Sequence, residues 1–329
     1  MSPGGGARFR RLYPDRAEGL DAAALAAAIP ARDPGERPFV ALNMIATADG
    51  RTTIAGRTAP IANRADHELF HALRARVDAV MVGAGTAGTE RYGRIVRDPD
   101  RRERRRAAGL EPDPLAVIVS ARLSLGPDLP LLQDESSRVV IITASDQALE
   151  GVRAQVEYLR PSDAPATPED LTGRAAMLPM APFARALRER YGIGRVMCEG
   201  GSVLAGALLR EGLVDELFLS VAPKLAAGTG PTVVTSPPLE LPPVSHRRLT
   251  TKPPGYPCGA PSAARSCSWT GYAQQSSRSP ARSWRWRAAS TWVAIRAAFP
   301  TGFARHSSRT TAPCATSSST QSRTATTRR

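Results

Sequence analysis

The sequence predicts an α/β fold in which helices cover both faces of a mostly parallel sheet. Short runs of Val, Ile, Leu and Ala, each long enough for a buried strand, alternate with segments of helical periodicity. The runs at 77–82 and 115–120 show no polar alternation, which is typical of parallel strands buried on both faces. Glycine-rich turns directly follow the runs at 77–82 and 195–198. Such sheets bind ligands at the carboxyl ends of their strands, so the same pattern indicates where a ligand lies.

The expected strands and helices alternate through the first 250 residues. Apolar runs predict strands at 39–46, 77–82, 115–120, 138–143, 156–159 and 195–198. Periodicity and capping residues predict helices at about 18–29, from Asn63 or Asp66 to near Arg76, at 182–191 and at 202–210. The apolar segment at 214–225 is a further strand. We expect it to close one edge of the sheet, where such sheets often carry an antiparallel strand.

Two glycine-rich corners indicate a ligand that carries phosphate. Gly83-Ala84-Gly85-Thr86 follows the strand at 77–82, and Glu199-Gly200-Gly201 follows the strand at 195–198. Without Cβ atoms, glycines let a ligand touch the main chain. The helix that begins after the second corner offers free N–H groups and a positive dipole end to an anion. A phosphate beside the Glu199 carboxylate is one interpretation, and ordinary tight turns are the other.

Composition divides the chain into three parts. The net charge is +14, from 44 Lys and Arg against 30 Asp and Glu. Residues 251–329 hold 12 of the basic residues, none of the acidic ones and all four tryptophans. We therefore expect an arm with a helix at 1–37, a domain at 38–250, and a disordered, basic, low-complexity tail at 251–329. Translation of a shifted reading frame is the favoured origin of the tail, and the alternatives are a native Arg/Ser-rich nucleic-acid-binding tail and an unfamiliar domain.

Several classes of protein are disfavoured. No apolar run approaches the roughly 18 residues of a membrane span, and the first six residues lack the charged and apolar regions of a secretion signal. Cys198 is the only cysteine before residue 251, so the domain has no disulfide framework, and we interpret this cysteine as a small core residue. A cytoplasmic protein is expected.

Two charged motifs have alternative interpretations. His67-Glu68-Leu69-Phe70-His71 spells the zinc-protease motif His-Glu-x-x-His, but residues 72–77 offer no third ligand, so we expect no metal. The basic run at 101–106 resembles a nucleic-acid patch, yet acidic residues surround it. A solvated surface helix is the favoured interpretation of that run.

The motifs taken together resemble the reductase domain of the bacterial riboflavin-biosynthesis deaminase/reductase family. They are Thr47-x-Asp49-Gly50, His71-x-Leu73-Arg74, Asp78-Ala-Val-x-Val-Gly83-Ala-Gly-Thr86, Glu199-Gly-Gly-x-x-Leu-x-Gly-Ala-Leu208 and Val214-Asp-Glu-Leu-x-Leu-x-x-Ala-Pro-Lys224. The resemblance covers about 38–243. The chain lacks the His-x-Glu and Pro-Cys-x-x-Cys motifs of a zinc deaminase, so it is similar to a stand-alone pyrimidine reductase. The resemblance implies a dihydrofolate-reductase-like fold and a homodimer.

In this family NADPH reduces the ribose of 5-amino-6-(ribosylamino)uracil 5′-phosphate to a ribityl chain. The resemblance implies that Thr58, Arg74 and Arg97 hold the substrate and its phosphate, and that Glu199 faces the substrate. Arg122 is considered for the 2′-phosphate, because a guanidinium binds phosphate with a fork of donors. Contacts to NADPH are implied for Ile45, Gly83, Gly85, Thr86, Glu90, Ser120, Thr143, Gly200, Gly201, Ser202, Val203 and Leu204.

The proposed chemistry needs few catalytic side chains, because the cofactor carries the hydride and the protein orients the reactants. Asp49 or Glu199 is expected to relay a proton or stabilise a cationic imine. The alternatives are an Asp-Gly turn for Asp49 and a carboxylate serving the helix dipole for Glu199. Glu90-Arg91-Tyr92 replaces the Asp-Asp-Pro that is common in the family, near the substrate phosphate. The substrate therefore stays open between a ribosylamino-pyrimidine phosphate and a related pterin such as dihydrofolate.

Overall fold

The computed structural model describes residues 6–13, 16–30, 35–164, 178–238, 245–251 and 293–298. Their strands form one sheet in the order β2-β1-β10-β11-β9-β3-β8-β4-β5-β6-β7. The seven parallel strands are β9 (Glu216–Ala222), β3 (Phe39–Thr47), β8 (Arg195–Cys198), β4 (Ala79–Gly83), β5 (Leu115–Val119), β6 (Arg138–Ile142) and β7 (Gln155–Leu159). The antiparallel extension consists of β11 (Val293–Ala298), β10 (Ser245–Thr251), β1 (Phe9–Tyr13) and β2 (Ala17–Leu20).

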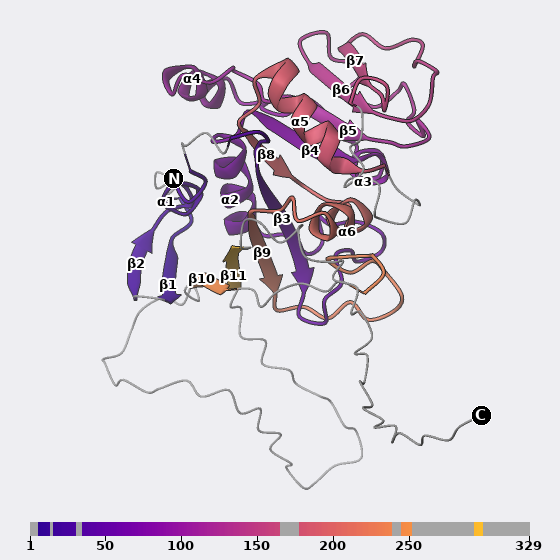
Figure 1. The fold of residues 1–329 in the computed structure, drawn as a ribbon. Helices are drawn as coiled ribbons and strands as arrows, with labels where there is room; N and C mark the ends of the chain where they lie inside the picture. The colour runs from indigo at the N-terminus through magenta and orange to yellow at the C-terminus, as the bar shows by residue number, and fades with distance from the viewer. Residues whose placement is uncertain are drawn as a thin grey trace, which may run out of the picture.

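Helices lie on both faces of the parallel strands (Figure 1). One face packs against α1 (Ala22–Ala26) and α2 (Arg64–Arg74), and the other packs against α5 (Met180–Tyr191) and α6 (Ser202–Arg210). The strand β4 supplies both cores, because successive side chains point to opposite faces of a strand. Val80 belongs to the core beneath α2, and Met81 belongs to the core beneath α5 and α6. The predicted three-layer α/β fold with a mostly parallel sheet is confirmed.

The strand expected at 214–225 has a different place from the one predicted. It forms β9, which lies inside the sheet, parallel to β3 and antiparallel to β11. β11 comes from the tail, so the expectation that residues 251–329 lack regular structure is wrong for Val293–Ala298. A physical reason is that the exposed edge of β9 has backbone N–H and C=O groups that need partners. The other tail residues after Thr251 lie outside the described residues.

The helix expected at 18–29 is also wrong in its bounds. Residues Ala17–Leu20 form β2, and α1 begins only at Ala22. Gly19, inside β2, has φ of +69°, a left-handed conformation that an α-helix does not contain, and the Asp21 side chain caps α1 by accepting from the Ala24 N–H. α2 begins as predicted, with the Asn63 side chain accepting from the Asp66 N–H. None of the helices in the described ranges is long and apolar enough to cross a membrane.

Candidate active site

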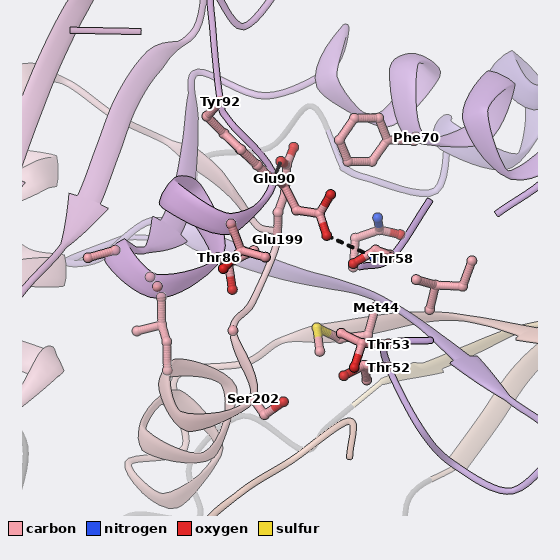
Figure 2. A pocket seen from close by; sticks show the side chains of 18 of the residues that line it. Met44, Thr52, Thr53, Thr58, Phe70, Thr86, Glu90, Tyr92, Glu199 and Ser202 are labelled. Carbon is pink, nitrogen blue, oxygen red and sulfur yellow. Dashed lines mark hydrogen bonds between the residues drawn. The ribbon is translucent and has the colours of Figure 1, made fainter. Parts of the chain in front are cut away.

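A large cavity opens at the carboxyl ends of the central parallel strands. Its volume of about 1700 Å³ exceeds the roughly 300–1,000 Å³ that is typical of one small-molecule site. The walls come from β3, α2, the turn after β4, and the start of α6 (Figure 2). Cys198, the last residue of β8, is paired with Leu42 of β3 and with Met81 of β4. Glu199 follows it directly and therefore lies on the cavity floor, between β3 and β4. The cavity therefore has room for more than one ligand.

The two glycine-rich corners meet in this cavity. The Gly83 N–H donates to the Gly200 carbonyl over 2.8 Å. A Cβ atom at Gly201 would lie 2.8 Å from the Thr86 hydroxyl, and one at Gly200 would lie 2.9 Å from the Met44 sulfur. Glycine at 201 thus lets the two corners approach each other, and glycine at 200 permits both the contact with Met44 of β3 and a φ of +87°. The α6 helix starts directly after them with no side-chain cap, which leaves main-chain N–H groups at its first turn for a ligand.

Glu199 is the carboxylate at the floor of the cavity, and α2 provides its ion-pair partner. The Arg74 guanidinium donates to both Glu199 oxygens, through Nε and Nη2, over 2.7 Å each. The Tyr92 hydroxyl donates to Glu199 Oε2 over 2.6 Å. The Glu199 and Arg74 side chains are only 2% and 10% exposed, respectively. A forked guanidinium and a hydroxyl therefore fix one buried carboxylate in position.

Electrostatics in this cluster follow from burial and from Glu199. Burial alone would lower the pKa of Arg74, but the adjacent Glu199 carboxylate outweighs it and the pKa is raised. Burial, and then the Glu199 charge, raise the pKa of Tyr92 well above its ordinary value. Tyr92 thus remains a proton donor to Glu199 at any physiological pH. Phe70 completes the cluster by stacking on Arg74, 4.1 Å from the ring centroid.

Two arginines that follow Ile95 in the chain line the cavity. Arg97 is exposed and lines the cavity. Arg101, on α4 (Pro99–Ala107), also lines it and lies 3.3 Å from Asp98. The basic run at 101–106 forms the predicted helix, but the expectation of a wholly solvated helix is wrong for one residue. Arg105 is 1% exposed because its guanidinium donates to the carbonyls of Arg74, Val77 and Glu111.

Comparison with known proteins decides the family. The model of the RibD C-terminal domain matches residues 38–252. The chain belongs to the RibD C-terminal domain family. It is 31% identical over 201 residues, 60% of this chain and 86% of the relative, to the 2,5-diamino-6-ribosylamino-4(3H)-pyrimidinone 5′-phosphate reductase of Archaeoglobus fulgidus. It is 29% identical over 198 residues, 58% of this chain and 81% of the relative, to the reductase of the same name from Methanothermobacter thermautotrophicus.

Solved structures show the same fold. A pyrimidine reductase-like protein from Corynebacterium diphtheriae superposes with a TM-score of 0.59 at 17% identity, covering 85% of this chain and 99% of that one. The Thermotoga maritima diaminohydroxyphosphoribosylaminopyrimidine deaminase/5-amino-6-(5-phosphoribosylamino)uracil reductase superposes with a TM-score of 0.52 at 18% identity, covering 80% of this chain and 57% of that one. The fold implied by the resemblance is thus confirmed.

Most of the residues expected to bind a ligand in this RibD C-terminal domain line the cavity. They are Ile45, Thr58, Arg74, Gly83, Gly85, Thr86, Glu90, Arg97, Ser120, Arg122, Glu199, Gly201, Ser202, Val203 and Leu204. Two of them have partners that the sequence did not indicate. Arg74 contacts Glu199 rather than lying open for a phosphate. Glu90, expected near the cofactor, accepts from the N–H of Thr58, a residue expected to bind the substrate, over 2.8 Å (Figure 2).

Three expected site residues are not among the lining residues. Gly200 lies behind the wall, against Met44. Thr143 is fully buried, and its hydroxyl donates to the Ala121 carbonyl. Asp49 accepts from the Thr47 hydroxyl and from the main-chain N–H groups at 226 and 227, and these bonds, led by that of Thr47, lower the pKa of Asp49 to about 2. The structure therefore gives Asp49 the turn-stabilising role, joining two loops.

The α2 helix contributes lining residues that sequence reasoning missed. Asp66, Phe70 and Arg74 are spaced by four, so they share one face of α2, and His67 and His71 lie beside them. Their spacing of four from Arg74 was the sequence signal that could have identified Asp66 and Phe70 as residues facing the site. Burial, followed by the charge of Arg101, lowers the pKa of His71 to about 4. Within the described ranges, no group of three or more His, Cys, Asp or Glu is arranged to hold a metal ion.

Proposed function

We propose that this chain is an NADPH-dependent reductase of a phosphoribosylamino-pyrimidine in riboflavin biosynthesis. The observation that carries the proposal is the joining of two glycine corners and one fixed carboxylate, Glu199, in a cavity of a RibD C-terminal domain. The substrate named for the archaeal relatives is 2,5-diamino-6-ribosylamino-4(3H)-pyrimidinone 5′-phosphate. The uracil counterpart is the second candidate within the same class.

The residues at the glycine corners fit a dinucleotide. A side chain at Gly201 would fill the gap beside Thr86, so the main chain alone forms that surface. The first turn of α6 presents N–H groups suited to a pyrophosphate. Val203 is 51% exposed, and this apolar side chain at the wall suits contact with an aromatic ring. We assign Arg122, exposed at the end of the cavity near Ser120, to a 2′-phosphate, which would favour NADPH over NADH.

A bound nicotinamide would supply a hydride to the C1′ carbon of the ring-opened imine form of the ribosylamine, and with a proton to the imine nitrogen the C=N bond becomes a C–N single bond. The chain's own residues hold the substrate for that step. Glu199 faces the ribosylamine and stabilises the positive charge that develops on its nitrogen. Arg74 and Tyr92 hold the carboxylate still, so little reorganisation is required during the reaction.

Two arginines that line the cavity are suited to bind the substrate phosphate. Arg97 and Arg101 lie at the substrate end, where they can donate to a phosphate that remains close to solvent. Arg74 is already committed to Glu199 and to the Ile95 carbonyl. We therefore assign the phosphate to Arg97 and Arg101, and Arg74 to the carboxylate. By resemblance we also propose a homodimer in the cytoplasm, which sedimentation and cell fractionation would test.

The experiment is a comparison of substrates with the purified full chain. Oxidation of NADPH and of NADH is followed with the diaminopyrimidinone phosphate, the uracil phosphate and dihydrofolate side by side. We expect turnover with a ribosylamino-pyrimidine phosphate, faster with NADPH, and none with dihydrofolate. Turnover with dihydrofolate alone, or with none of the three by a protein shown to be folded, would refute the proposal.

A further inference from the structure

Four acidic residues line the cavity: Asp66, Glu90, Asp98 and Glu199. Three of them already have charged or main-chain partners. Glu199 accepts from Arg74 and Tyr92, Glu90 accepts from the Thr58 N–H and lies 3.7 Å from Arg57, and Asp98 caps α4 beside Arg101. Glu90 and Asp98 are thus paired within the protein, and Glu199, held by Arg74 and Tyr92, is already assigned to the ribosylamine nitrogen.

Asp66 is the exception. It lies in the first turn of α2, where its own N–H is bonded to the Asn63 side chain. Burial raises the pKa of its carboxylate above the ordinary value, and the nearby Ser220 side chain on β9 opposes that rise. In the described part of the chain, no Arg or Lys forms an ion pair with Asp66. One hydroxyl leaves most of the acceptor capacity of a carboxylate unused.

A half-buried carboxylate with spare acceptor capacity suits a neutral ligand with N–H donors. It does not suit the substrate phosphate, because two anions in a cavity of low dielectric repel each other. The phosphate belongs instead with two cations that line the cavity, the exposed Arg97 and the partly exposed Arg101. Ser220 is paired in register with Ile45 of β3, which also lines the cavity, so Asp66 faces the sheet side of the site. The part of the substrate left for Asp66 is its heterocyclic base.

We propose that Asp66 binds the pyrimidine ring and selects the 2-amino-4-oxo form over uracil, an inference that rests on the proposed function. The diaminopyrimidinone presents two adjacent N–H donors at one ring edge, the 2-amino group and N3–H. A carboxylate accepts both. The uracil edge presents N3–H beside a carbonyl oxygen, which repels a carboxylate. A site built to bind both donors rejects a base that lacks one, because a buried polar group is then left unpaired.

The test is the variant D66N in the full chain. An asparagine side chain accepts from N3–H through its oxygen and donates to the C2 carbonyl through its amide, so it matches the uracil edge. The ratio of kcat/KM for the diaminopyrimidinone phosphate to kcat/KM for the uracil phosphate is measured for wild type and variant. We expect this ratio to fall at least about tenfold, the size of one charge-assisted hydrogen bond, with the KM for NADPH unchanged. The control D100N, an exposed aspartate of α4 that does not line the cavity, keeps the wild-type ratio.

The outcomes separate this inference from the proposed function. Wild-type protein that reduces neither pyrimidine refutes the proposed function. Wild-type protein that is active, with a ratio that D66N leaves unchanged, overturns the role of Asp66 alone. If D66N fails to fold, D66S is used, since the single, shorter and uncharged serine oxygen cannot replace the two-oxygen carboxylate opposite two adjacent N–H donors and must also lower the ratio.

Discussion

Arg74 and Glu199 are 125 residues apart in the chain and joined by two hydrogen bonds of 2.7 Å each. The pair links helix α2 to the corner that follows β8, across the floor of the cavity. Both side chains are almost fully buried. Tyr92 donates to the carboxylate of this pair, Phe70 stacks on its guanidinium, and the glycine corner at Gly200 directly follows Glu199.

Removing Arg74 leaves a buried carboxylate without its cation. The variant R74M is expected to lower the free energy of unfolding by about 3–5 kcal/mol, the typical cost of breaking a buried ion pair from one side. R74K keeps a charge but cannot form the bidentate contact, so its loss is smaller. Urea unfolding of the two variants and wild type measures the difference. Equal stability of R74M and wild type would show that the pair does not support the fold.

Replacing Glu199 with glutamine removes the negative charge but keeps the shape. E199Q is expected to lower kcat/KM for the pyrimidine substrate by about a hundredfold or more, with little change in the affinity for NADPH, because the lost interaction acts on the developing charge. E189Q, an exposed glutamate of α5, is the matched control. Steady-state kinetics of both variants measure this effect. If kcat/KM of E199Q equals that of the wild type, Glu199 takes no part in the reaction.

The two glycine corners predict a size limit at Gly201. In G201A the new methyl carbon would lie 2.8 Å from the Thr86 hydroxyl, so one corner must move. We expect the KM for NADPH to rise at least about tenfold while the fold is retained, because the added methyl occupies the ligand-facing surface. G88A is the control, since a Cβ atom there meets nothing within 4 Å. A KM for G201A within error of that for G88A contradicts the assignment of these corners to the cofactor.

His71 predicts a pH dependence of stability. Its pKa is about 4 in the folded protein and about 6.5 in an unfolded chain. Between these values the unfolded state binds more protons, so stability falls as pH decreases from 6.5 towards 4. The variant H71N should show a smaller fall over that window, and H67Q, an exposed residue on the same helix, serves as the control. Parallel slopes for wild type and H71N would contradict the buried position of His71.

The parallel strands were predictable from the sequence because helices bury them on both faces, which removes polar alternation from runs such as 115–120. The glycine corners were predictable as well, because each one directly follows an apolar run whose end the sequence marks. Local patterns failed where tertiary contacts decided the outcome. The alanine-rich segment at 18–29 has helical composition, yet pairing with β1 makes Ala17–Leu20 a strand, and the helix begins only at Ala22. The strand Val293–Ala298 has no distinguishing pattern, and pairing with β9 is what places it.

Within the site, the sequence indicated which residue types to expect but not which partners they would take. Glu199 was identified from its corner, but its pairing with Arg74 depends on two elements far apart in the chain. Asp66 was recognised only as a cap, because nothing local shows that its side chain reaches Ser220. Arg105 was assigned to a solvated face, since its acceptors are carbonyls of other segments.

The most direct measurement combines binding and product analysis in one sample. Folded wild-type protein is heated with and without NADPH, and a matched sample is incubated with NADPH and the diaminopyrimidinone phosphate for mass spectrometry. The account predicts a higher melting temperature with NADPH and a product that has gained two hydrogen atoms at the sugar. A folded protein whose melting temperature does not respond to NADPH, and whose substrate is recovered unreduced, would contradict it.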